Sequence, residues 1–164
     1  MGTLTMKAAI LFGSKSDSQV MKKAADVFRQ FGVEYLSFAV SAHRTPELLS
    51  EILGRLEDEG VEVIIAGAGL AAHLPGVIAS KTLVPVIGVP LNSGGLGGLD
   101  ALLSIVQMPK QVPVATVGID NAANAAYLAC QMLAVKYPEL LASLAEYRKN
   151  LKEELAKESA GIDL

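Results

Sequence analysis

Five short apolar segments, each followed by a helical pattern, constrain the fold of this chain more than any other feature. Near-continuous apolar runs of this length are typical of strands that are buried on both faces. Strands of this kind that alternate with helices predict a parallel sheet with helices on both faces and right-handed crossovers. The expected strands are Ala8–Phe12, Tyr35–Val40, Val61–Ala66, Val84–Val89 and Val112–Val117.

The helices between these strands carry recognisable start signals. Ser16 and Gln19 have the spacing of a capping box before the first helix. Thr45 as N-cap and Pro46 at the first helical position predict the start of the second. We expect a single α/β domain over residues 1–164, with a core at about 7–135. Further helices are expected at Leu74–Lys81, Leu99–Val106, Asn121–Val135 and, as a C-terminal helix, at 138–157.

Composition excludes several classes of protein. The net charge is −3 and no cluster of Lys or Arg occurs, so we expect no nucleic-acid partner. The apolar stretch 63–91 is long enough to suggest a membrane helix, but glycines, prolines, His73 and Lys81 interrupt it, so we expect no membrane partner. A single cysteine, Cys130, cannot form an internal disulfide or a thiolate metal cluster. With no signal-peptide pattern at the N-terminus, these features predict a cytoplasmic protein.

Hydrophobic residues make up 51% of the chain and aromatic residues only 5%. The core is therefore expected to be aliphatic and rich in alanine. So much apolar surface on a small domain also predicts faces that are hidden between subunits.

The conspicuous loops all follow the carboxyl ends of predicted strands. They cover residues 13–17, 41–46, 67–76 and 90–98. Ligands of parallel α/β sheets bind outside the carboxyl ends of the strands. The four loops therefore predict one composite site.

The loop 41–46 places an imidazole beside a guanidinium, directly before a helix start. His43 is one of only two histidines, and a neutral histidine at physiological pH is a competent general base. Arg44 is a fixed cation suited to a phosphate or a carboxylate. A surface histidine that merely flanks a helix is the alternative interpretation.

The turn 13–17 joins a strand to a helix. Its free amides and two hydroxyls can form an anion cradle, and Asp17 can hold ribose hydroxyls. The spacing is not that of a Walker motif. A simple capped helix remains an equally good interpretation of this segment alone.

The loop 67–76 contains the second histidine. Gly67, Gly69 and Ala72 formally match a dinucleotide fingerprint, but they follow the third strand, and no acid lies near Val89, where one is expected. The small residues are better suited to close approach of the backbone to a flat ligand. His73 either donates to that ligand or satisfies a backbone carbonyl. No metal-binding motif and no Gly-x-Ser-x-Gly elbow occur in the sequence.

Taken together, five segments resemble the bacterial-type, class I N5-carboxyaminoimidazole ribonucleotide mutases of purine biosynthesis. The similarity runs in order from Ala8 to Leu133. The Ala-Ala-His-Leu-Pro-Gly segment favours this class over the related aminoimidazole ribonucleotide carboxylases that use free CO2. The segments that carry the resemblance are 13–17, 41–46, 66–69, 71–76 and 103–109.

The resemblance implies a flavodoxin-like, three-layer α/β enzyme that needs no metal and no organic cofactor. It would move a carboxyl group from N5 to ring carbon C4 of carboxyaminoimidazole ribonucleotide by decarboxylation and recarboxylation, with CO2 as a transient species. It implies a homo-octamer with sites at subunit contacts, where the C-terminal helix extends to neighbouring subunits.

The resemblance also implies the roles of individual residues. His43 and His73 would be the catalytic residues: His43 would be the acid and base, and His73, with the backbone of 67–72, would line the pocket for the base and CO2. Ser14 and Arg44 would contact the phosphate region and Asp17 the ribose. The substrate-binding set that follows from the motifs is Gly13, Ser14, Ser16, Asp17, Ser41, Ala42, Arg44, Gly69, Ala72 and Leu74.

The chain also departs from the family pattern. Leu70 stands where glycine is expected and can narrow the pocket, while Gly94, Gly95 and Gly97 make their loop more flexible. Two other hypotheses remain: a carboxylase that uses free CO2, and a flavodoxin-like nucleotide-binding module without turnover. The two histidine-bearing loops argue against the second.

Overall fold

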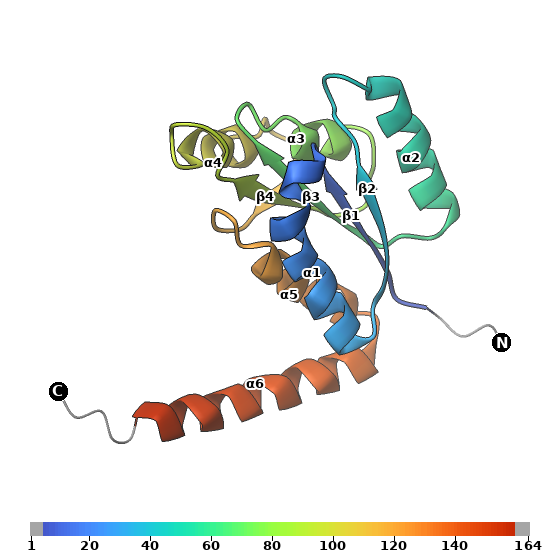
Figure 1. The fold of residues 1–164 in the computed structure, drawn as a ribbon. Coiled ribbons are helices and arrows are strands. Elements are labelled where there is room, and N and C mark those ends of the chain that lie inside the picture. The colour runs from blue at the N-terminus through green and yellow to red at the C-terminus, as the bar shows by residue number, and fades with distance from the viewer. Residues whose placement is uncertain (1–4, 160–164) are drawn as a thin grey trace.

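The computed structural model of the chain describes residues 5–159, and its five parallel strands form one sheet (Figure 1). The spatial order of the strands is β2-β1-β3-β4-β5. This is the strand order of flavodoxin-like sheets, so the predicted fold class is confirmed. The strands are β1 (Lys7–Phe12), β2 (Glu34–Ala39), β3 (Val63–Gly69), β4 (Val86–Leu91) and β5 (Ala115–Thr116).

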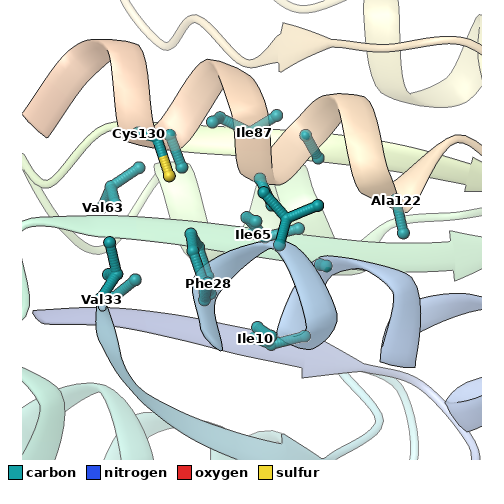
Figure 2. Packing of buried hydrophobic residues seen from close by; sticks show 14 of the residues in the cluster. Ile10, Phe28, Val33, Val63, Ile65, Ile87, Ala122 and Cys130 are labelled. Atoms are coloured by element: carbon teal, nitrogen blue, oxygen red, sulfur yellow. The ribbon is translucent and has the colours of Figure 1, made fainter. Parts of the chain in front are cut away.

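Helices cover both faces of the sheet. Successive strand residues point to opposite sides, and since nearly all of them are apolar, both faces must be buried. Ile10 and Ile65 face a layer that contains α1 (Ser18–Phe31) and α5 (Ala122–Ala134). Figure 2 shows this layer, with Phe28 and Cys130 among its buried side chains. The neighbouring strand residues Leu11 and Ile64 belong to the other layer. That layer is covered by α2 (Pro46–Asp58), α3 (Leu74–Ala79) and α4 (Leu99–Val106).

The strand bounds differ from the sequence prediction by one residue in β1 and β2 and by more in β3, β4 and β5; β4 begins and ends two residues later than predicted. The predicted strand 112–117 pairs with β4 only at Ala115 and Thr116. Pro113 has no amide hydrogen to give to a ladder, and Gln111 has a positive φ of 76° that turns the chain before it. The third strand begins two residues later than predicted and continues through the glycines to Gly69.

The capping prediction for the first helix was wrong. A 3-10 turn, η1 (Lys15–Asp17), precedes α1, and the Ser14 hydroxyl rather than Ser16 caps that turn by accepting from the Ser16 amide. At the second helix, Thr45 is the N-cap and Pro46 the first helical residue, as predicted. The Thr45 hydroxyl, however, bonds to the backbone of Ser41 instead of to the helix.

The last helix, α6 (Pro138–Ser159), contacts the domain through its first half. Leu140 and Leu144 are buried, and Tyr147 stacks on Tyr127 of α5 with ring centroids 5.6 Å apart. Beyond this contact, α6 projects past the rest of the molecule (Figure 1). Within residues 5–159, no helix is long and apolar enough to cross a membrane.

Candidate active site

A cavity of about 430 Å³ lies at the carboxyl ends of the first four strands. It includes the point between β1 and β3 where the strand order reverses, which is where flavodoxin-like sheets bind ligands. The structure therefore brings all four predicted loops to one place. Every residue that the sequence predicted for the site lines this cavity: Gly13, Ser14, Ser16, Asp17, Ser41, Ala42, His43, Arg44, Gly69, Ala72, His73 and Leu74.

The two histidines meet inside the cavity. His43 Nε2 lies 2.6 Å from His73 Nδ1, and the rings are tilted by 73°. One of these nitrogens must donate and the other accept, because an imidazole nitrogen without hydrogen is the only acceptor available. While this contact holds, the pair carries at most one positive charge. Of the two roles left open for His73, this geometry favours contact within the site over pairing with a backbone carbonyl.

The loop after β2 is tied into a fixed shape by its own hydroxyls. The Arg44 amide donates to Ser41 Oγ at 3.2 Å, and Thr45 Oγ1 donates to the Ser41 carbonyl at 3.1 Å. The guanidinium of Arg44 reaches the end of β1, where Nη2 donates to the Gly13 carbonyl at 3.1 Å. The loop therefore holds Arg44 directly above the turn that follows β1.

That turn presents hydroxyls and a carboxylate to the cavity. Ser16 Oγ donates to Ser14 Oγ at 3.0 Å and lies 3.4 Å from Asp17 Oδ1. Burial raises the pKa of Asp17 above its ordinary value, and this outweighs the hydrogen bonds from Ser16 and the backbone that lower it. A half-buried carboxylate of this kind gains from a ligand that donates hydrogen bonds to it.

The segment after β3 passes very close to its neighbours. A Cβ at Gly69 would lie 2.4 Å from Ser93 Oγ, so a side chain there has no room. Leu70 and Ala72 then adopt positive φ angles of 57° and 45°. This turn brings His73 to the N-cap of α3 and into the cavity.

The sequence prediction missed Ser93, which lines the same cavity from the loop after β4. This loop is anchored at its start, where the Asn92 amide donates to Asp120 Oδ1 at 2.9 Å. The position of Ser93, directly after a buried strand in a glycine-rich loop, was the available signal. Its packing against Gly69 involves residues distant in sequence and needed the structure.

Electrostatically, the cavity combines one fixed cation, one half-buried carboxylate and a pair of imidazoles. No group of three His, Cys, Asp or Glu side chains within the described part of the chain could hold a metal ion. The fold and the cavity thus define a class: a flavodoxin-like α/β protein with one composite pocket that gathers a guanidinium, a carboxylate, serine hydroxyls and two imidazoles.

The comparisons with known proteins assign this enzyme to a family. The family model described as AIR carboxylase matches residues 7–154, and the chain belongs to that family. A protein of Pyrococcus abyssi named N5-carboxyaminoimidazole ribonucleotide mutase is 58% identical over 146 residues, 89% of this chain and 84% of that protein. A Thermotoga maritima protein of the same name is 50% identical over 157 residues, 96% of this chain and 92% of that protein.

A solved structure supports the same assignment. The crystal structure of Treponema denticola PurE has a TM-score of 0.88 and 26% sequence identity to this chain. The match covers 96% of this chain and 99% of that one. The resemblance inferred from the motifs is therefore confirmed.

Proposed function

We propose that this chain catalyses the conversion for which its relatives are named, the transfer of a carboxyl group from N5 to C4 of carboxyaminoimidazole ribonucleotide in purine biosynthesis. The observation that carries the proposal is the contact between His43 and His73 in a cavity that also holds Arg44 and Asp17. Family membership gives the reaction, and the cavity supplies groups suited to each part of it.

The reaction needs one proton to leave the enzyme and one to return. His43 gives a proton to N5, the bond from N5 to the carboxyl carbon breaks with its electrons staying on nitrogen, and CO2 is released. Ring carbon C4 then attacks CO2, and the proton on C4 passes to His43, which restores aromaticity and the starting state of the enzyme. A pair that carries at most one positive charge fits this cycle, because His73 can support either form of His43 through their hydrogen bond.

The remaining residues are assigned to binding. The turn after β1 contributes the hydroxyls of Ser14 and Ser16, and Arg44 lies beside it. These groups suit a phosphate, since hydroxyls and a guanidinium are strong donors to phosphate oxygens. Asp17 accepts the ribose hydroxyls. Ser41, Ala42, Gly69, Ala72 and Leu74 shape the walls of the cavity around the ring.

The proposal is tested by supplying two substrates separately. Wild-type protein is expected to convert the N5-carboxylated ribonucleotide, and to be much slower with the decarboxylated ribonucleotide and bicarbonate. His43→Asn should keep nucleotide affinity and lose turnover by about 10²–10⁴-fold. His73→Asn, which leaves the acid and base in place, should lose less. A preference for the decarboxylated ribonucleotide and free CO2 would favour the carboxylase hypothesis. Tight binding of the ribonucleotide without any product would favour a nucleotide-binding module.

The assembly and compartment are part of the same proposal. An exposed apolar stripe on α4 (Leu99, Leu103, Val106) and exposed leucines along α6 support the expected homo-octamer, in which α6 reaches neighbouring subunits. Light scattering should give about eight times the 17.1 kDa of one chain, and a monomer at micromolar concentration would contradict this. The cytoplasm is the expected compartment, because the single Cys130 is buried and free.

A further inference from the structure

Leu70 has a strained backbone conformation, and the burial of its side chain offsets little of that strain. Its φ of 57° lies in the left-handed region, which residues with a Cβ rarely adopt. The residue is 56% exposed, so little apolar surface is buried in return. A strained residue that gains little from packing points to a role at the site it borders.

Leu70 lies at the edge of the active-site cavity farther from the phosphate-binding loops. It follows β3, next to β4, whereas Arg44 and the turn 13–17 follow β2 and β1. The neighbouring lining residues Ala68, Ala71 and Ala72 are small and apolar. Apart from the Ser93 hydroxyl, this side of the cavity therefore offers a largely apolar wall to the part of the ligand that lies away from the phosphate.

Two close contacts join the loops after β3 and β4, and one of them involves Leu70. Leu70 Cδ2 lies 2.9 Å from where a Cβ at Gly94 would be, and Gly94 has a φ of 89°. One residue earlier on each loop the arrangement is reversed, because there the glycine, Gly69, follows β3 and the side chain that packs on it, Ser93, follows β4. In each pair a side chain from one loop fills the space left by glycine on the other, so Leu70 packs on the loop after β4.

We propose that Leu70 is an apolar lid that retains CO2 between its release from N5 and its capture by C4. CO2 is uncharged and small, so an enzyme holds it by excluding water and closing the way out rather than by ion pairing. Leu70, packed against Gly94, would cover the β3 and β4 side of the cavity. This inference rests on the proposed function, since it assigns a role within that reaction.

Two substitutions separate the lid from the strain. Leu70→Gly removes both the side chain and the left-handed strain, whereas Leu70→Ala removes most of the side chain and keeps the strain. Both should release more CO2 to solution than wild type, but only Leu70→Gly should unfold at a higher temperature. Leu96→Ala is the matched control, because Leu96 is an exposed leucine in the loop after β4 that does not line the cavity.

The experiment uses substrate that carries isotopic carbon in the carboxyl group, in buffer with unlabelled bicarbonate. Wild type and Leu96→Ala should keep most of the label in the product, while both Leu70 variants should lose it several-fold more per turnover. Label retention in the variants equal to that of wild type overturns the lid while the proposed function stands, and so does a wild type that leaks as much as they do. A wild type that forms no product at all overturns the proposed function.

Discussion

Gly69→Ala is the substitution whose effect the structure defines most sharply. The added Cβ would lie 2.4 Å from Ser93 Oγ and 2.7 Å from Ser93 Cβ. Ordinary contact between such atoms is roughly 3.5 Å, so one of the two loops must move by about 1 Å. Overpacking of this kind costs about 1–3 kcal/mol of stability. A shift of that size beside His73 should also lower kcat/KM by up to about 10²-fold, because positioning errors near 1 Å have such effects.

The assay measures the free energy of unfolding in denaturant together with kcat/KM. Gly95→Ala is the matched control: Gly95 lies in the loop after β4 and has no atom within 4 Å of a built Cβ, so the substitution should leave kcat/KM unchanged and should keep or raise stability, by up to about 1 kcal/mol. Ser93→Gly in the Gly69→Ala background removes both close contacts and should recover most of the lost stability. If Gly69→Ala is as stable and active as wild type, or if Ser93→Gly recovers nothing, the reasoning is refuted.

Three further predictions concern the binding loops. Arg44→Ala should weaken phosphate-bearing nucleotides far more than their nucleosides in calorimetry, and equal losses for both would contradict a phosphate contact. Burial raises the pKa of Asp17, and the ionised form accepts hydrogen bonds from ribose hydroxyls more strongly than the protonated form, so affinity should fall as pH drops through this raised pKa. Asp17→Asn should bind more weakly but without that acidic fall. Gly13→Ala should keep or raise stability, by up to about 1 kcal/mol, yet weaken nucleotide binding; unchanged affinity would show that no ligand approaches this turn.

The layered fold could be predicted from the sequence because local pattern and burial agree. Apolar runs, helix starts and glycine stops all indicate the same α/β alternation, and only their ends were misplaced. The length of the fifth strand was overestimated because the prediction used the apolar pattern of 112–117 and not the missing amide hydrogen of Pro113. The capping box failed because a 3-10 turn, which the same polar residues also favour, begins at Lys15.

The location of the site was predictable for a different reason. In a parallel sheet all carboxyl ends lie at one edge, so residues distant in sequence, such as Ser14 and His73, are brought to one cavity by the strand order alone. The contact between His43 and His73 was not predictable, because it depends on how far two loops reach across the end of β1. The pairing of Leu70 with Gly94 is likewise a matter of tertiary packing.

Some glycines of this chain are required by packing, whereas others leave open space. Gly88 and Gly69 are required by packing, since a Cβ would lie 2.3 Å from Ile105 Cγ2 in the first case and 2.4 Å from Ser93 Oγ in the second. Gly13 differs, because a Cβ there would meet only Asp17 Oδ2, at 4.0 Å. The fold thus leaves room for a side chain at the end of β1, directly below Arg44 and within the cavity. The open space at Gly13 lies beside the donors of Arg44 and Ser14, and the phosphate proposed for these donors is a group that would fit there, so a methyl group at Gly13 would compete with it.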